Sequence, residues 1–153
     1  MSLGGGGGGQ QQMQQIAQEI EQIEEQIEAL EEEISGLQNE QQEMNEAMEA
    51  IKAIESGDTV QVPLGGDAFL RAEIQDIDEV IVEFGAGYAA EQDQDDAVEI
   101  LENKQDTLDE RIEDVRSDIA GLETESEELE QQAQQMQQQQ MQQMQQMQQQ
   151  DDE

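Results

Sequence analysis

The chain has 153 residues, with 40 acidic side chains against five basic ones and a formal net charge of −35. Aromatic residues make up only 2%, which is too little large apolar surface for a conventional globular core. Cysteine and histidine are both absent, which excludes disulfides, thiolate metal sites and histidine-based catalysis. Because so few basic residues leave no phosphate-binding patch, no direct binding of nucleic acid is expected.

The sequence predicts where the protein resides, namely in a cytoplasm of high salt concentration. No apolar run approaches the ~20 residues of a membrane span and no signal peptide is recognisable, so we expect a cytoplasmic protein without a membrane partner. At about 1 M salt the Debye length is about 3 Å, so a dense acidic surface no longer repels itself. The alternative is an acidic coiled coil from a mesophile, but acidity on the predicted strands as well as the helices favours the halophile.

Residues 1–9 include six consecutive glycines and are expected to be flexible. Residues 10–56 are predicted to form a coiled-coil helix, because eleven of its twelve heptad seam positions are apolar. Ser56-Gly57 is expected to end this helix, since glycine suits the left-handed cap position. The a and d positions of the seam are Met13, Ile16, Ile20, Ile23, Ile27, Leu30, Ile34, Leu37, Gln41, Met44, Met48 and Ile51.

Residues 57–92 interrupt the heptads and are predicted to form two β-hairpins. Apolar and polar residues alternate there as in half-buried strands, and Gly65-Gly66-Asp67 and Gly85-Ala86-Gly87 mark the turns. Roughly 35 residues of hairpin are marginal alone, so strands of another subunit are expected to cover their apolar face. The predicted assembly residues are Val60, Val62, Leu64, Leu70, Ile74, Val80, Val82, Phe84 and Tyr88.

Residues 93–136 are predicted to form the second coiled-coil helix, opened by acidic residues that suit an N-cap. The two seams mesh at one antiparallel register, which places Ile34 against Val115 and Met13 against Met136. The predicted fold is therefore α+β, a long antiparallel two-helix coiled coil joined by two β-hairpins. The second seam consists of Val98, Leu101, Gln105, Leu108, Ile112, Val115, Ile119, Leu122, Ser126, Leu129, Ala133 and Met136.

Residues 137–153 change to glutamine and methionine and are expected to form a flexible tail. One interpretation is a low-complexity, partly disordered segment. The other is an adhesive tip, since methionine is common at promiscuous binding surfaces. The seam nearby is expected to be underfilled, with Ala133 opposite Ile16 and Ser126 opposite Ile23, so that the helices can separate. The predicted substrate-binding residues at this tip are Met13, Ile16, Ile20, Met136, Met141, Met144 and Met147.

Two strings in the hairpin segment carry a resemblance. Residues 56–66 are SGDTVQVPLGG and residues 82–91 are VEFGAGYAAE, and with the order helix, two hairpins, helix they resemble archaeal prefoldin alpha subunits over about residues 13–135. The resemblance implies an ATP-independent chaperone in which two alpha and four beta subunits join hairpins into an intersubunit β-barrel platform. It also implies that the coiled-coil tips bind unfolded client proteins, prevent their aggregation and pass them to a group II chaperonin. The glutamine/methionine tail is longer and more biased than the family pattern.

Catalytic patterns are absent from the sequence. It has no Ser/His, Cys/His or phosphate-loop arrangement, so neither an enzyme activity nor a cofactor is expected. Acidic pairs such as Asp95/Asp96 and Asp76/Asp78 arise by chance among 40 acids, so no metal site is expected. The alternative to a chaperone is a coiled-coil scaffold or tether that oligomerises through the same hairpins. A scaffold keeps its seam closed to the end, whereas a chaperone exposes apolar side chains there.

Overall fold

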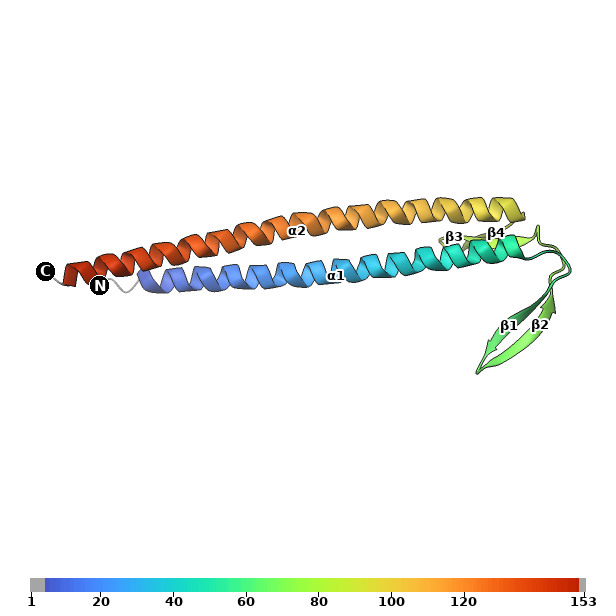
Figure 1. The fold of residues 1–153 in the computed structure, drawn as a ribbon, viewed down its shortest axis with the longest axis horizontal. Coiled ribbons are helices and arrows are strands. Elements are labelled where there is room, and N and C mark those ends of the chain that lie inside the picture. Colours follow the sequence, from blue (N-terminus) through green and yellow to red (C-terminus); the bar gives the residue numbers. More distant parts are fainter. Residues whose placement is uncertain (1–4, 152–153) are drawn as a thin grey trace. The chain divides into compact units, whose positions relative to one another are not determined.

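The computed structural model describes residues 5–151, and residues 1–4 and 152–153 lie outside the description. The order of its elements, two long helices joined by two hairpins, confirms the predicted α+β class. The chain divides into a helical unit, Met1–Ile34 with Glu113–Glu153, and a hairpin unit, Ser35–Ile112. The elements in chain order are α1 (Gly5–Ala53), β1 (Thr59–Gly65), β2 (Ala68–Glu73), β3 (Val80–Gly85), β4 (Tyr88–Gln92) and α2 (Gln94–Asp151) (Figure 1).

In the helical unit, the residues of α1 and α2 that are shielded from solvent follow the predicted seam. Every seam position of either helix in this unit is buried or half-buried. Val115 is completely buried, and only 8% of Ile16 and 7% of Ile23 are exposed. The expectation of an underfilled seam at these isoleucines is therefore wrong. Ser126 and Ala133, the small residues of the second seam, are half-buried as well.

Both helices extend further towards the chain termini than expected. α1 begins at Gly5 and α2 continues to Asp151, so Gly5–Gly9 and residues 137–151, expected to be flexible, are helical. Glutamine and methionine are good helix formers, which explains the continuation of α2. A β-carbon at Gly9 would stand 2.5 Å from Nε2 of Gln140, so glycine lets Gln140 lie against the backbone of α1. The expectations for residues 1–4 and 152–153 fall outside the described residues.

The hairpin unit contains two separate two-stranded antiparallel sheets. β1 pairs with β2, which places Val62 opposite Leu70, and β3 pairs with β4. Each hairpin closes through two residues with positive φ, Gly66-Asp67 in the first and Ala86-Gly87 in the second. Positive φ at both central residues defines a type I′ turn, whose twist matches that of the paired strands. The turns predicted at these two sites are confirmed.

Hydrogen bonds fix the junctions between helices and hairpins. Oδ1 of Asp93 accepts a hydrogen bond from the N–H of Asp96 at 2.7 Å and so caps the start of α2. Gly57 has a φ of 92° and donates its N–H to the carbonyl of Ile74 at 2.7 Å, which links the end of α1 to the β1–β2 hairpin. Nε2 of Gln94 donates to the carbonyl of Ile51 at 2.6 Å, which satisfies an acceptor in the last turn of α1.

Candidate functional surfaces

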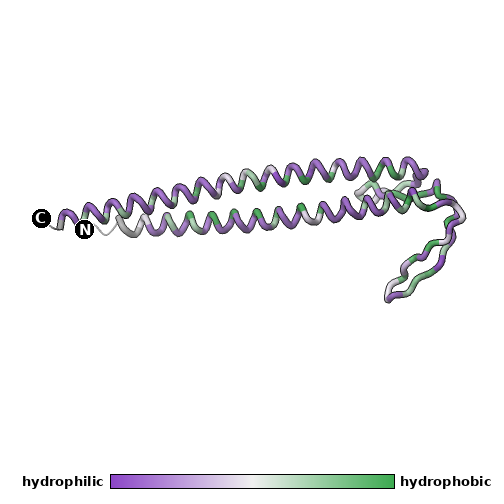
Figure 2. Tube along the Cα trace, viewed as in Figure 1, coloured by the Kyte–Doolittle hydropathy of each residue, from purple (hydrophilic) through white to green (hydrophobic). Residues whose placement is uncertain are grey.

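Large exposed apolar side chains of the described residues occur in two segments only. Figure 2 shows that both helices are hydrophilic over most of their length, with hydrophobic positions recurring between the polar ones. Contiguous exposed apolar residues mark binding surfaces, whereas single scattered ones do not. We call the first group the hairpin surface, which is Val62, Leu64, Phe69, Leu70, Ile81, Phe84 and Tyr88. We call the second group the methionine stripe, which is Met141, Met144 and Met147.

The nine predicted assembly residues differ in their exposure. Five of them, Val62, Leu64, Leu70, Phe84 and Tyr88, belong to the hairpin surface. Val60, Ile74 and Val80 are half-buried, and Val82 is buried within the chain itself. Phe69 and Ile81 are exposed but were not predicted, because the sequence prediction took only one face of each strand. Phe69 and Ile81 could have been identified from the sequence, because apolar residues occur at successive positions of these strands and therefore on both faces of the hairpins.

The second hairpin contacts α2, which sequence reasoning did not foresee. Phe84 lines a shallow pocket with Ile100, Asn103, Lys104 and Thr107, which share one face of α2. Nζ of Lys104 donates a hydrogen bond to the carbonyl of Glu83. Lys104 is one of only five basic residues in the chain, and here it anchors β3 to the helix. The sequence held a signal for this contact. The four residues share one face of α2, and Ile100 among them is an apolar residue outside the predicted seam, which needs a packing partner of its own.

Two glutamines cross-link the helices of the hairpin unit. Nε2 of Gln41 donates to the carbonyl of Gln105 at 3.3 Å, and Nε2 of Gln105 donates to the carbonyl of Gln41 at 3.0 Å. The amides also reach Oδ1 of Asp109 at 2.5 Å and Oδ1 of Asn45 at 2.7 Å, respectively. Both glutamines occupy predicted a positions, where a polar residue specifies register at a cost in stability. The reciprocal bonds therefore support the predicted antiparallel register.

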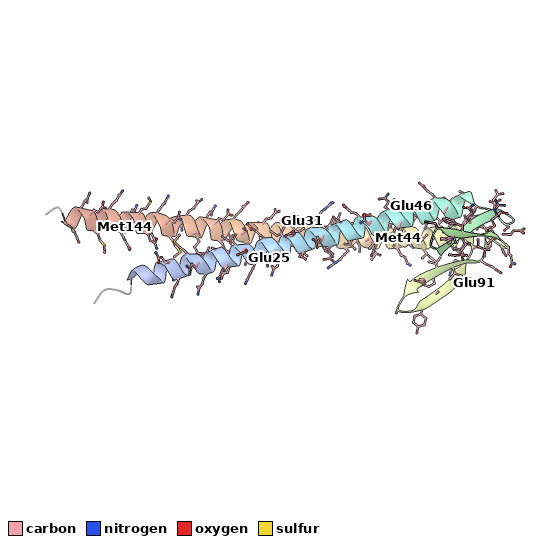
Figure 3. The ribbon with its side chains drawn as sticks, turned by 90° about the horizontal axis from the view of Figure 1, so that it is seen from below. Glu25, Glu31, Met44, Glu46, Glu91 and Met144 are labelled. Atoms are coloured by element: carbon pink, nitrogen blue, oxygen red, sulfur yellow. The ribbon has the colours of Figure 1, made fainter. Side chains whose placement is uncertain are left out.

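The methionine stripe is the accessible part of the predicted substrate-binding set. Met141, Met144 and Met147 are 67%, 69% and 70% exposed, and Figure 3 shows Met144 in the C-terminal part of α2. Residues three apart on a helix are surface neighbours, so the three thioethers form a continuous row. The other four predicted residues belong to the seam, since Ile16 is buried and Met13, Ile20 and Met136 are half-buried.

Charge is distributed unevenly along the chain. Residues 1–18 and 131–150 contain no ionisable side chain, whereas acidic residues such as Glu25, Glu31 and Glu46 are spread along the intervening helices (Figure 3). The methionine stripe and the first turns of α1 therefore form an electrically neutral part of the helical unit. Electrostatic repulsion of an acidic ligand is weaker at Met141 and Met144 than at Met147, because Asp151 follows Met147 by one helical turn.

The described residues contain neither a metal-binding cluster nor a membrane-spanning helix. Histidine, cysteine and carboxylate side chains form no group of three or more there that is placed to hold a metal ion. Neither α1 nor α2, over the part the structure covers, has an apolar stretch long enough to cross a bilayer.

Comparison with known proteins agrees with this architecture. The prefoldin subunit family model matches residues 23–150. The prefoldin alpha subunit of Haloarcula marismortui is 62% identical over 115 residues, which cover 75% of each chain. The corresponding subunit of Halorubrum lacusprofundi is 59% identical over 104 residues, or 68% of each chain.

A solved structure shares the fold. Filamentous prefoldin from Methanocaldococcus jannaschii matches with a TM-score of 0.52 and 24% identity, covering 78% of this chain and 95% of that one. The relatives from halophilic archaea also confirm the halophilic type predicted from the acidity. The chain belongs to the prefoldin family of molecular chaperones, as a subunit of the alpha class found in halophilic archaea.

Proposed function

We propose that this chain acts in the cytoplasm, without catalysis or ATP, as the alpha subunit of a chaperone that holds unfolded proteins. Its hairpins join those of beta subunits, two alpha with four beta, in a β-barrel platform. The methionine stripe and the apolar seam residues beside it bind unfolded client proteins and prevent their aggregation. The assembly then passes the clients to a group II chaperonin.

The segregation of exposed apolar side chains carries the proposal. All ten large exposed apolar side chains of the described residues belong either to the hairpin surface or to the methionine stripe. One surface therefore serves assembly and the other serves client binding, with a polar coiled coil in the intervening sequence. A scaffold or tether needs no exposed methionines beyond the last apolar seam position, so this distribution favours the chaperone over that alternative.

Open strand edges support assembly through the hairpins. Each sheet has only two strands, so each strand keeps one unpaired edge of backbone N–H and C=O groups. Leu64, Leu70 and Tyr88 are more than half exposed beside these edges. Strands of neighbouring subunits would satisfy the backbone groups and cover the side chains at the same time, as a closed barrel does.

Neutral, flexible thioethers support client binding at the methionine stripe. Methionine has three rotatable bonds and fits many apolar shapes, which a chaperone without a fixed ligand requires. Each contact is weak, so useful affinity requires several subunits to bind one client chain at once. The uncharged residues 131–150 lessen the repulsion of acidic clients relative to the acidic part of the helices.

The test is suppression of client aggregation by the purified oligomer without nucleotide, using a matched pair of triple variants. In the first, Met141→Gln, Met144→Gln and Met147→Gln remove the apolar row while keeping a good helix former at each position. Burying a methionine stabilises by about 1.5–3 kcal/mol, so losing the stripe should raise the concentration for half-protection by more than about tenfold.

The control replaces the same three residues by leucine, which keeps the apolar surface without the flexible thioether and should protect better than the glutamine variant. Removing the residues before Ile20 and after Glu130 should spare assembly and abolish protection. If either the glutamine variant or the truncated chain protects denatured client as well as the native chain does, binding at this end of the helical unit is contradicted.

A further inference from the structure

The seven methionines that the structure describes fall into two environments. Met141, Met144 and Met147 are 67–70% exposed, whereas Met48 is only 7% exposed and Met13, Met44 and Met136 are half-buried. The chain contains no cysteine, so thioethers are its only sulfur nucleophiles. Susceptibility of sulfur to oxidation follows its exposure. The three most exposed methionines of the described chain are therefore those of the methionine stripe.

We propose that the methionine stripe is an oxidation site, at which a neutral hydroperoxide converts the three thioethers to sulfoxides and thereby releases bound client. This inference rests on the proposed binding of clients at the stripe. It adds that oxidation of the same side chains stops the oligomer from holding client, so that the stripe is also a redox switch.

The reaction balances with the peroxide as the only oxidant. A lone pair of the methionine Sδ attacks the terminal oxygen of the hydroperoxide, a new S–O bond forms and the O–O bond breaks. The departing oxygen takes up the proton and leaves as water or an alcohol. The sulfur loses two electrons and the peroxide gains them. The product carries a polar S=O group in place of a thioether, and methionine sulfoxide reductases reverse this change.

Charge favours an uncharged oxidant at this place. Hydrogen peroxide is neutral at ordinary pH, so the chain's net charge of −35 does not hinder its approach to the stripe. Met141 and Met144 have no ionisable side chain within four positions on the helix, whereas Met147 has Asp151 four positions away.

The consequences for fold and for binding differ. The stripe side chains are exposed and bury little apolar surface within the chain, so their oxidation leaves the seam intact. Binding of client instead depends on their apolar surface, which the sulfoxide oxygen makes polar. Oxidation of Met48 or Met44 would disturb packing, but their burial delays it. Mild oxidation therefore changes holding activity before it changes structure.

The first experiment measures where oxygen is incorporated. The full-length chain in its purified oligomer is treated with hydrogen peroxide, and peptide mass mapping follows the gain of about 16 Da per sulfoxide. Met141, Met144 and Met147 should react about tenfold faster than Met48, which is the ratio of their exposed fractions. Equal rates at all methionines, or faster reaction at Met44 and Met48, would overturn the assignment of the site.

The second experiment separates the switch from the client site. Native oligomer and the triple variant Met141→Leu, Met144→Leu, Met147→Leu are compared in aggregation suppression before and after the same treatment. The native oligomer should lose most of its protection and regain it after methionine sulfoxide reductase treatment. Each sample is compared with its own protection before treatment. The protection given by the leucine variant should not fall on oxidation, because leucine has no sulfur, and any methionines on partner subunits are oxidised equally in both samples.

Each remaining outcome has one meaning. If the triple glutamine variant is inactive but the oxidised native oligomer stays fully active, the client site stands and the switch is refuted. If the glutamine variant is as active as the native chain, the proposed client site fails and the switch fails with it. If the leucine variant loses protection as fast as the native oligomer, oxidation acts elsewhere and the inference is overturned.

Discussion

At the scale of single residues, the polar positions within the seam are the most informative. Gln41 and Gln105 interrupt otherwise apolar heptads, and each donates its side-chain amide to the backbone carbonyl of the other. A helix backbone carbonyl already accepts one hydrogen bond, so these contacts use its second lone pair. Because a shifted register would separate the two amides from their acceptors, the pair defines how α1 and α2 align within the hairpin unit.

Replacing both glutamines by leucine should raise the stability of the chain. The double variant Gln41→Leu, Gln105→Leu removes both polar groups together and extends the apolar seam, which should stabilise by about 1–2 kcal/mol. Thermal unfolding followed by circular dichroism at fixed salt measures the change. Gln42→Leu, at the exposed neighbouring position, serves as the control and should have an effect within about 0.5 kcal/mol. A lower melting temperature for the double variant would mean that the hydrogen bonds outweigh apolar contact.

At the scale of elements, the two hairpins differ in how much of their surface the chain itself covers. Val82 in β3 is buried, and Lys104 and Phe84 hold this hairpin against α2. The first hairpin exposes Val62, Leu64, Phe69 and Leu70. A two-stranded ribbon with this much exposed apolar surface is marginal without a partner. The first hairpin therefore has the greater need of strands from another subunit.

Two aspartates on the first hairpin should prevent assembly without unfolding the helices. Val62 and Leu70 are direct cross-strand partners on one face, so Val62→Asp with Leu70→Asp places two like charges together where an intersubunit contact would bury them. Native mass measurement should show loss of the oligomer, while helical circular dichroism stays within about 10% of the native signal. Thr59→Asp with Gln61→Asp adds the same charge to the opposite face of β1 and should retain the oligomer. An unchanged native mass for the first variant would place assembly elsewhere.

At the scale of the whole molecule, net charge is the dominant property. Prefoldin alpha subunits that are 59–62% identical to this chain belong to halophilic archaea, and the 40 carboxylates of this chain have only five basic side chains to offset them. Mutual repulsion opposes every association between such chains when screening is weak. High salt shortens the range of the repulsion until apolar contacts and hydrogen bonds decide the outcome.

Lowering the salt should dissociate the oligomer. Between 3 M and about 0.2 M potassium chloride the Debye length grows from less than about 3 Å to about 7 Å, so carboxylates on neighbouring subunits begin to repel one another. Sedimentation should show subunits separating at the lower end, and circular dichroism should show fraying of the helices. Chloride and sulfate at equal ionic strength should act alike if screening is the cause. Flat stability from 0.1 M to 3 M would contradict the electrostatic explanation.

The sequence by itself determined the fold class, the seam and the family. Heptad spacing, the change to period-two alternation at residues 57–92 and the glycine-rich turns are local patterns, and local patterns report secondary structure and its buried face directly. The seven substrate-binding residues were predicted from the sequence only as one group. The tertiary structure divided it into the exposed methionine stripe and four covered seam residues, because exposure depends on the opposite helix.

Only the tertiary structure decided the remaining features. The contact of Gly9 with Gln140, the contact of Phe84 with α2 and the reciprocal bonds of Gln41 and Gln105 each depend on residues far apart in the chain. A single-sequence pattern carries no information on which distant side chain fills the space or accepts the hydrogen bond. The physical reason is that packing is decided by pairs of elements, whereas periodicity is a property of one element at a time.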